Sequence, residues 1–340
     1  MLLSGSECNT GREDQALGYF IGIDGGGTKT ALCAASVDDP AQHYSATSGT
    51  YWREIGIPEV AQKLKNSVNS LMEGKNDQVD GIAMGLPCYG ESAEGDRALG
   101  QAVRDIFAPI PIYLTNDVEV GWAGSLALEP GINVVAGTGS IAFGKDSNGK
   151  SVRCGGWSEY FGDEGSCYWM GKKVMELFSK QADGRMPKDE LYTTIYREFD
   201  LQNDMSFIDI MYEKYIGDRK KVAMLQILAE KAAMAGSSGA KALYREAVNE
   251  LLLLAAAVRE KLDFTEKPWK VSYSGGLFRA GEFVLPQFTR EIEKTGGKVT
   301  APLFEPVDGA VLLAFQHFNA DGLDKIKQVI LKAKSNKPRS

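Results

Sequence analysis

The first third of the chain alternates between short apolar runs and longer segments with helical periodicity. Apolar runs such as YFIGID have the length and composition of buried strands, whereas apolar residues at three- and four-residue spacing predict amphipathic helices. The predicted order is strand 19–24, strand 30–37, strand 43–49, helix 57–72, strand 79–87, helix 92–107, strand 111–114 and helix 117–128. Strands that alternate with helices indicate an α/β layered domain.

The same kind of pattern returns after Gly131 and is then interrupted by long helices. Residues 132–136 and 141–146 predict strands on either side of a glycine turn. Residues 165–263 are mostly helical in pattern, and the helix predicted over 240–262 has one apolar stripe typical of helix–helix packing. The remaining elements are strand 269–274, helix 281–294, strand 297–302 and helix 308–318.

Two segments repeat one arrangement. GIDGGGTKTALC, residues 22–33, and VVAGTGSIAFG, residues 134–144, both read as strand, glycine turn, strand. This predicts a duplicated α/β unit. The chain is therefore divided into a loose leader (1–17), an N-terminal lobe (18–129), a C-terminal lobe (130–318) with a helical insertion over about 165–263, and a C-terminal helix and tail (319–340).

Composition narrows the class of protein. The chain has 340 residues, 44% hydrophobic and 24% charged, with a formal net charge of -7 and no long basic stripe, so we expect no nucleic-acid partner. The longest apolar run, Leu251–Val258, is shorter than the roughly 20 residues of a membrane span. Five scattered cysteines and two histidines favour neither a disulfide framework nor a zinc site. We expect a cytoplasmic protein without a signal peptide or membrane segment.

The first glycine turn offers bare backbone to a ligand. Gly25, Gly26 and Gly27 fit neither a P-loop, which needs adjacent Gly-Lys, nor a dinucleotide fingerprint, since a strand follows. N–H groups at such a tip can converge on phosphate oxygens, with a hydroxyl from Thr28 and a positive charge from Lys29. Asp24 is placed to hold magnesium through water. A turn that serves only the fold is the alternative.

Two further glycine turns complete the set. Gly137, Thr138, Gly139 and Ser140 repeat the chemistry of the first turn. The pair Gly275–Gly276, which follows a strand, would let an adenine and ribose lie against backbone, or is a plain turn.

These three elements, in this order, resemble the actin-type ATPase and sugar kinase superfamily, a duplicated ribonuclease H-like fold. The stretches GIDGGGTKT, TNDVEVGWAGS, VVAGTGSIAFG, CGGWSEYFGDEGSCYWMG and YSGGLF are more closely similar to the N-acetylglucosamine kinase branch of the benzoyl-CoA-reductase-type (BadF/BadG/BcrA/BcrD-type) ATPase family. The resemblance covers residues 19 to about 318. It implies ATP and Mg²⁺ as cofactors, a small-molecule sugar as acceptor, and phosphoryl transfer to the 6-hydroxyl of an amino sugar.

Asp117 is the candidate general base. It follows an apolar strand, at the carboxyl end where open α/β sheets place their sites. From the residues alone, an acidic side chain in a helix's first turn, with Asn116 as cap, explains it as well. The resemblance implies that Asp117 matches the catalytic aspartate of the family.

The resemblance also implies a sugar pocket. It assigns Asp163 to sugar hydroxyls, with Gly156 and Ser158 beside it and Trp52 near the ring; the full predicted substrate set is Thr50, Trp52, Asp117, Ser140, Gly156, Ser158 and Asp163. As alternatives, Asp163 or Ser166 caps a helix and Trp52 only packs. Trp157 and Trp169 are expected in the core.

The sequence differs from the N-acetylglucosamine kinase branch at three places that would line the sugar pocket. Thr50 and Ile141 stand where these kinases carry asparagines, and Pro87-Cys88-Tyr89-Gly90 replaces a serine-glycine pair. A site discriminates by its hydrogen-bonding partners, so the identity of the sugar is left open.

Two other classes of function remain alternatives. An ATPase activator of the same superfamily would hold an iron–sulfur cluster between two subunits; Cys154 is near a suitable place, but a second ligand is not evident. A non-catalytic nucleotide sensor or chaperone-like binder is the third class. A homodimer is compatible with the sequence.

Overall fold

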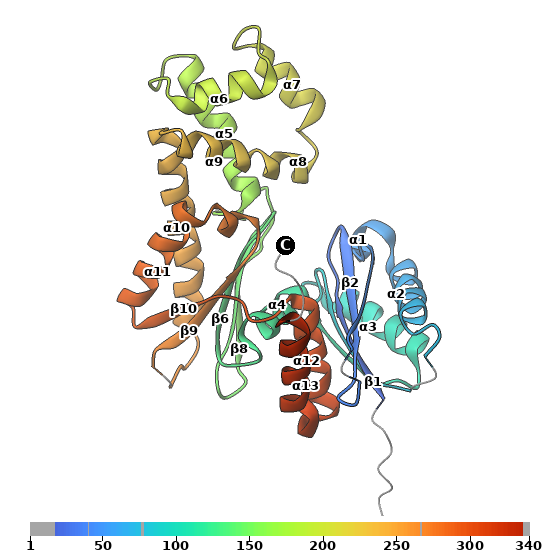
Figure 1. The fold of residues 1–340 in the computed structure, drawn as a ribbon. Helices are drawn as coiled ribbons and strands as arrows, with labels where there is room; N and C mark the ends of the chain where they lie inside the picture. Colours follow the sequence, from blue (N-terminus) through green and yellow to red (C-terminus); the bar gives the residue numbers. More distant parts are fainter. Residues whose placement is uncertain (1–17, 40, 76–77, 266, 336–340) are drawn as a thin grey trace, which may run out of the picture. The chain divides into compact units, whose positions relative to one another are not determined.

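The computed structural model describes residues 18–39, 41–75, 78–265 and 267–335 (Figure 1). The predicted leader, residues 1–17, lies outside the described residues. The described chain packs as two compact units, one with residues up to Leu114 and from Ala310 onward, the other Thr115–Gly309. The lobe boundary at 129/130 stays a prediction; these packing units divide the chain within strand β5 and helix α12.

The first unit contains a five-stranded mixed sheet. Its strands are β1 (Tyr19–Asp24), β2 (Lys29–Ala35), β3 (His43–Ser48), β4 (Val79–Leu86) and β5 (Ile112–Asn116). Their order is β3-β2-β1-β4-β5, with β1 antiparallel to β2 and parallel to β4. The turn between β1 and β2 is the first glycine turn, at the carboxyl end of the central strand.

Alternate residues of β1 face opposite layers of the first unit. Ile21 and Ile23 are fully buried in the core formed with α2 (Ile57–Leu71) and α3 (Ala93–Phe107). Phe20 points the other way and packs on Phe315 of α12 (Pro306–Phe318), with ring centroids 4.3 Å apart. The remaining helices are α1 (Trp52–Ile55), the 3-10 helix η2 (Ala320–Gly322) and α13 (Leu323–Ser335). Two buried isoleucines of α13 show that this helix packs into the same unit.

The second unit repeats the sheet of the first. Its strands are β6 (Gly131–Ala136), β7 (Ser140–Lys145), β8 (Ser151–Gly155), β9 (Trp269–Ser274) and β10 (Gly297–Thr300), in the order β10-β9-β6-β7-β8. The central β6 is antiparallel to β7 and parallel to β9. Taken in chain order, both sheets therefore follow the pattern 3-2-1-4-5, and the two glycine turns occupy equivalent places. The predicted duplicated α/β fold is confirmed.

Helices α4 (Asp117–Leu126) and α10 (Ser238–Arg259) cover opposite faces of the second sheet. Val134 lies in the core with Val258 of α10, whereas Phe143 contacts Trp122 of α4 at 6.1 Å between ring centroids. The 3-10 helix η1 (Gly276–Phe283) and α11 (Leu285–Lys294) complete the layer beside α10.

The predicted helical insertion is present between β8 and β9. Besides α10 it comprises α5 (Cys167–Ala182), α6 (Glu190–Phe199), α7 (Ser206–Lys214), α8 (Arg219–Met224) and α9 (Gln226–Met234). In Figure 1, α6 and α7 lie beyond α5, away from the sheet. Helices α5 and α8 come so close that a Cβ on Gly171 would overlap the carbonyl group of Val222. This contact fixes α8 relative to the N-terminal half of α5.

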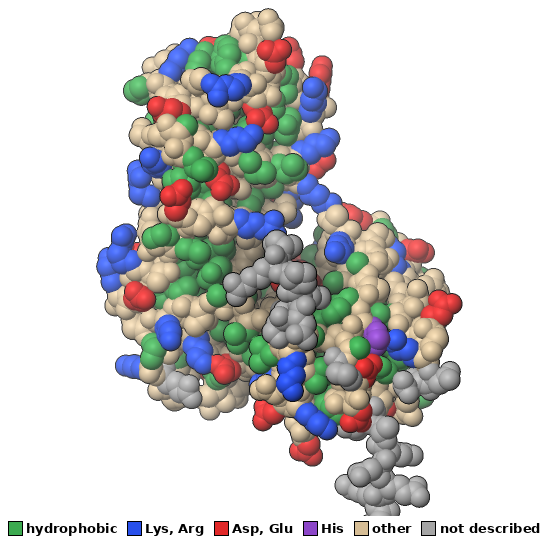
Figure 2. Space-filling view, viewed as in Figure 1, with side chains coloured by type: hydrophobic (Ala, Val, Ile, Leu, Met, Phe, Trp, Pro, Cys, Tyr) green, Lys and Arg blue, Asp and Glu red, His purple; other side chains and the backbone are tan. Residues whose placement is uncertain are grey.

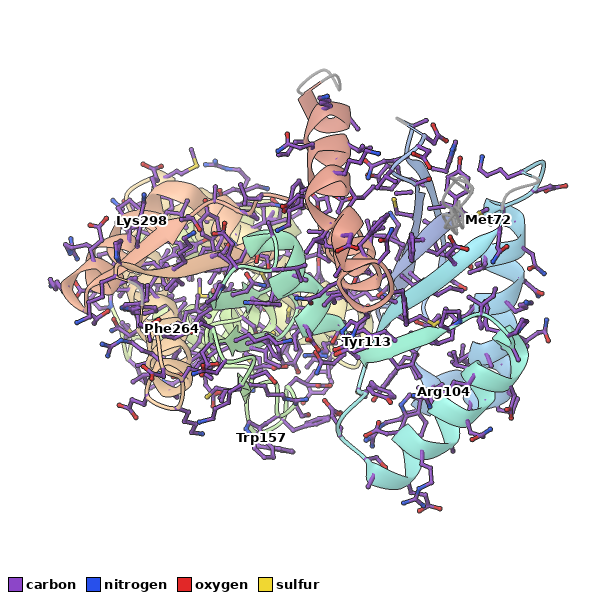
Figure 3. The ribbon with its side chains drawn as sticks, turned by 90° about the horizontal axis from the view of Figure 1, so that it is seen from below. Met72, Arg104, Tyr113, Trp157, Phe264 and Lys298 are labelled. Carbon is purple, nitrogen blue, oxygen red and sulfur yellow. The ribbon has the colours of Figure 1, made fainter. Side chains whose placement is uncertain are left out.

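One core assignment is wrong. Trp157 is 72% exposed, and Figure 3 shows its side chain pointing away from the ribbon. Gly155 and Gly156 both adopt positive φ, which turns the chain off the sheet edge before the tryptophan. Trp169 is partly buried against the core of the second unit, as expected.

Acidic and basic side chains are interspersed over the face shown in Figure 2. None of the helices formed by described residues is long and apolar enough to cross a membrane.

The contact between α5 and α8 can be tested by adding one methyl group. We expect Gly171→Ala to lower the free energy of unfolding by about 1–3 kcal/mol, because backbone rather than a side chain must move. The thermal midpoint should fall by roughly 2–4 °C for each kcal/mol. Gly100→Ala in α3 is the matched control. A Cβ on Gly100 would lie 2.9 Å from Nη1 of Arg104, a flexible side-chain end that can move aside, so the thermal midpoint should stay the same or rise slightly. Equal midpoints for both variants would contradict the interpretation.

Candidate functional site

The first glycine turn presents backbone at its tip. Gly25 is buried and donates its N–H to the Gly85 carbonyl at 2.7 Å, while Gly27, Thr28 and Lys29 are exposed. A Cβ on Gly25 would lie 2.8 Å from the Thr50 hydroxyl, so the glycine is needed for packing as well as for the turn. Among the hydrogen bonds of the described residues, none uses the amides of Gly26, Gly27 or Thr28. These amides are suited to bind an anion.

A second segment supports this turn from the side. The Thr50 N–H donates to the Gly26 carbonyl at 3.0 Å, and the Thr50 hydroxyl pairs with Thr30 at 3.0 Å. A Cβ on Gly49 would overlap the Gly27 carbonyl group, and the Lys63 ammonium donates to the Gly49 carbonyl at 3.1 Å. Thr50 is only 1% exposed, so its place in the structure is a support for the turn. Its predicted contact with sugar stays a prediction.

Asp24 ends β1 immediately before the glycines and is half-buried. It pairs in register with Gly85 of β4 and Ala31 of β2, so its backbone is fixed by both neighbouring strands. One carboxylate beside exposed backbone amides fits magnesium, which keeps several waters and takes its other ligands from phosphates. Of the described residues, no group of three or more His, Cys, Asp and Glu could hold a metal by itself.

Trp52 and Cys88 lie near the end of β4. The Trp52 ring covers Gly95 of α3, where a Cβ would lie 2.7 Å from it, and its buried Nε1 has no partner among the described residues. The Arg53 guanidinium lies 5.1 Å from the ring centroid. Cys88 has positive φ; burial, reinforced by Glu91, raises the pKa of its thiol to about 11. At neutral pH this position therefore presents an uncharged thiol.

The second glycine turn is held by the first turn of α5. The N–H groups of Cys167 and Tyr168 donate to the carbonyls of Gly137 and Thr138 at 2.9 and 3.4 Å. Among the hydrogen bonds of the described residues, none uses the amides of Thr138 or Gly139. The turn's carbonyls are thus engaged by the helix, and its amides are left as donors for an anion.

The third glycine pair packs directly on the second turn. A Cβ on Gly275 would overlap the backbone of Ala136 and Gly137, and Gly275 has φ +102°. A Cβ on Gly276 would lie 3.3 Å from the Cys167 sulfur. The structure therefore brings the predicted adenosine and phosphate elements of the second unit together.

Asp163 joins the second turn to the loop before α5. It is 4% exposed, and one carboxylate oxygen accepts the Ser140 N–H at 3.3 Å. Its other oxygen pairs with Arg219. Burial raises the pKa of the Asp163 carboxyl, while the Arg219 charge and the Ser140 amide oppose that rise. Ser166, not Asp163, caps α5, because its hydroxyl accepts the Trp169 N–H at 3.1 Å.

The other predicted sugar residues of this unit lie along the same loop. Ser140 is buried, and its hydroxyl donates to the Glu164 carbonyl at 2.6 Å. Gly156 donates its N–H to the Ser140 carbonyl at 2.9 Å. Ser158 has φ +126° and accepts the Tyr160 N–H at 3.4 Å. Gly156, Ser158 and Asp163 are thus on one loop with positive φ at all three positions, a conformation typical of functional loops.

Asp117 is the first residue of α4, directly after β5. Asn116 caps the helix, because its side-chain oxygen accepts the Glu119 N–H at 2.8 Å. In the same first turn, the buried Glu119 pairs with Lys145 at 3.3 Å and accepts a hydrogen bond from Thr115. The other nine residues of α4 are buried. Asp117 is therefore carried by a helix that neighbouring elements hold on almost every side.

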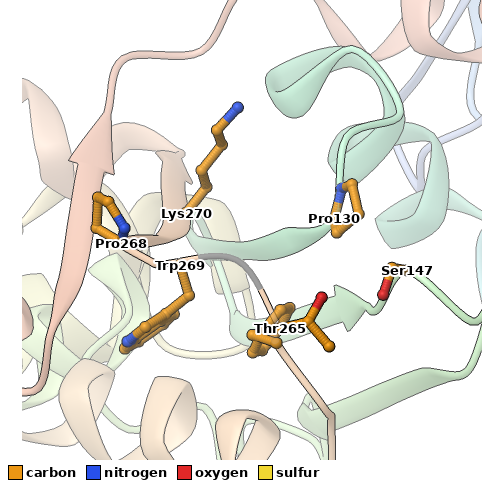
Figure 4. A pocket seen from close by; sticks show the side chains of 7 residues that line it. Pro130, Ser147, Thr265, Pro268, Trp269 and Lys270 are labelled. Carbon is orange, nitrogen blue, oxygen red and sulfur yellow. The ribbon is translucent and has the colours of Figure 1, made fainter.

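Two cavities lie elsewhere in the second unit. One of about 20 Å³, lined by Pro130, Ser147 and Trp269 among others, is shown in Figure 4. Because β6 and β9 begin at Gly131 and Trp269, it lies at the amino ends of these strands, opposite the glycine turns. It is large enough for about one water molecule. A larger space between α10 and α11, about 280 Å³, is bordered by Leu253, Arg259 and Glu291.

Sequence reasoning missed three residues at these turns. Gly49 and Lys63 support the first turn, and Arg219 reaches the second from the helical insertion. Gly49 directly precedes Thr50, which was already a candidate, so its position in the sequence was a usable signal. Arg219 carried no local signal, because it lies 56 residues from Asp163 in a run of three basic residues.

Comparisons with known proteins agree with this architecture. The model of the BadF/BadG/BcrA/BcrD ATPase family matches residues 21–314. An N-acetylmuramic acid/N-acetylglucosamine kinase of Clostridium acetobutylicum is 28% identical over 309 residues, covering 87% of this chain and 98% of the relative. An N-acetyl-D-glucosamine kinase of Dictyostelium discoideum is 27% identical over 312 residues, covering 87% and 97%.

Solved structures show the same fold at lower identity. A Chromobacterium violaceum protein, assigned provisionally as an N-acetylglucosamine kinase, has a TM-score of 0.66 at 24% identity, covering 88% of this chain and 99% of its own. A ROK family glucokinase from Streptomyces griseus, in complex with glucose and AMPPNP, has a TM-score of 0.54 at 17% identity, covering 88% and 100%. With its duplicated sheets and glycine turns, and a family match over most of its length, the chain belongs to the BadF/BadG/BcrA/BcrD ATPase family.

Proposed function

We propose that this protein is an ATP-dependent kinase that phosphorylates the 6-hydroxyl of an amino sugar, N-acetylglucosamine or a related hexosamine. The observation that carries the proposal is the pair of equivalent glycine turns, each with amides at its tip, on a chain that also places Asp117 at the start of a buried helix. The kinases that match it over almost their whole length support the choice of acceptor.

The phosphate chemistry is assigned to the glycine turns. The amides assigned to phosphate oxygens are those of Gly26, Gly27 and Thr28 in the first turn and of Thr138 and Gly139 in the second, with the Thr28 hydroxyl and the Lys29 charge beside them. Gly25 and Gly137, whose own N–H groups are used within the protein, keep the two turns free of side chains. Fixed donors of this kind stabilise the charge that spreads over a transferring phosphoryl group. Gly275 and Gly276, which pack on the second turn, are assigned to the nucleoside. Asp24 would hold magnesium through water, and the ion would neutralise phosphate charge.

Asp117 is assigned the role of general base. Its carboxylate would orient the acceptor hydroxyl for in-line attack and accept its proton as the bond to phosphorus forms. A buried helix suits this task, since catalytic groups must be held within a fraction of an ångström. Asp163, Gly156 and Ser158 are assigned to the sugar hydroxyls, and Trp52 to the sugar ring.

The general base is tested by Asp117→Asn. We expect the rate of sugar-dependent ADP release to fall by roughly 10²- to 10⁴-fold, with ATP affinity nearly unchanged, because the amide cannot accept the proton. Asp209→Asn is the matched control: Asp209 is an exposed acid in the first turn of α7, and its loss should leave the rate unchanged. Wild-type turnover by the Asp117 variant would refute the assignment.

The acceptor is tested by a panel in a coupled ADP-release assay: glucosamine, N-acetylglucosamine, N-acetylmuramic acid, N-acetylmannosamine and glucose. We expect turnover with at least one amino sugar and none with its 6-deoxy analogue, which lacks the attacking hydroxyl. Phosphorylation of glucose alone, or ATP hydrolysis that ignores every sugar, would overturn the proposed acceptor.

The raised pKa of Asp163 predicts how acceptor binding depends on pH. As the pH falls through this raised pKa, the carboxylate gains a proton, loses its negative charge and becomes a weaker acceptor for the hydroxyl groups of a sugar. We expect KM for the sugar to rise on acidification, beginning at a higher pH than for an exposed aspartate. In Asp163→Asn, KM should be high and flat over the same range. A wild-type KM that follows the same course with pH as the KM of Asp163→Asn would contradict a role of this carboxylate in sugar binding.

A further inference from the structure

Arg219 lies against the tip of the second glycine turn. A Cβ on Gly139 would lie 2.7 Å from Nη2 of Arg219, so the guanidinium touches bare backbone that any other residue would cover. The same Cβ would lie 2.9 Å from both carboxylate oxygens of Asp163. The Arg219 guanidinium and the Asp163 carboxylate thus both lie against Gly139, where the turn has no side chain.

Two carboxylates and one helix contact fix the arginine. Arg219 pairs through Nη2 with Asp163, and its Nε lies 3.5 Å from Glu159. It is the first residue of α8, and α8 is locked to α5 through Gly171. Because α5 also holds the carbonyls of the turn, the turn and the arginine have one common support.

Charge compensation explains why a cation is needed here. A carboxylate in contact with Gly139 would repel a polyphosphate bound to the amides of the turn. Arg219 neutralises Asp163, and its side chain remains 41% exposed. A guanidinium has five N–H donors in a planar fork, more than its two carboxylate contacts use, and this geometry suits phosphate.

We propose that Arg219 is a nucleotide-binding residue, whose guanidinium bonds the β- or γ-phosphate of ATP at Gly139 while it is oriented by Asp163 and Glu159. The proposal rests on the proposed function, because it needs ATP at this turn. It gives the helical insertion a direct contact with the nucleotide.

The test compares binding of Mg-ATP, Mg-ADP and AMP by calorimetry in wild type, Arg219→Gln, Arg219→Lys and Lys220→Gln. We expect Arg219→Gln to weaken ATP binding about 10- to 100-fold, the usual effect of losing a hydrogen bond between charged groups. AMP affinity should be unchanged, which also shows that the variant is folded. Arg219→Lys, which keeps the positive charge, should weaken ATP binding less than Arg219→Gln. Lys220→Gln removes the same charge from the next, exposed residue of α8 and should bind all three like wild type.

Several outcomes would overturn the proposal. The proposal is wrong if Arg219→Gln binds the three nucleotides like Lys220→Gln. It is also wrong if Arg219→Gln raises KM for the sugar but keeps the wild-type ratio of ATP to AMP affinity, because the arginine would then only position Asp163. If wild type releases ADP in a sugar-dependent manner in either case, the proposed function survives. Failure of wild type to bind ATP at all would overturn both.

Discussion

Backbone packed against backbone at the glycine turns is the constraint on which the rest of the structure depends. In the first unit Gly49 lies over the carbonyl group of Gly27, and in the second Gly275 lies over the junction of Ala136 and Gly137. Each contact is too close for a Cβ. At both turns carbonyl groups accept hydrogen bonds within the protein, whereas several amides at the tips have no partner among the described residues. The first turn achieves this without a helix.

Buried hydroxyls behind the turns hold this geometry. Thr50 pairs with Thr30 in the first unit, and Ser140 donates to the Glu164 carbonyl in the second. Both hydroxyl residues are almost fully buried, where an unsatisfied polar group would be costly. Each therefore ties its turn to a neighbouring segment: the end of β3 in one unit, the loop before α5 in the other.

Most of the fold could be predicted because its signals are local. Apolar periodicity located the long helices and every strand except β8, and two glycine turns between strands indicated the duplication. The position of Asp117 after β5 followed from the same pattern. The exposure of Trp157 could not be predicted, since it depends on the path of the loop after Gly156. Burial of Thr50 and Ser140 was missed because a hydroxyl beside a glycine turn reads equally well as ligand or as support.

The place of Arg219 shows why sites are harder to predict than elements. Its local sequence is a basic run at the start of a short helix, which by itself indicates a solvated surface. Its contact with Gly139 exists only because Gly171 lets α8 approach α5, and because α5 in turn binds the second glycine turn. The position of this one charge thus depends on two contacts between elements that are distant in sequence: α5 with α8, and α5 with the second glycine turn. Asp163 belongs to the same arrangement: its carboxylate is assigned to the sugar, yet it touches the turn assigned to phosphate. In the proposed arrangement one carboxylate therefore serves both ends of the site, and Arg219, which pairs with it, offsets its charge beside the polyphosphate.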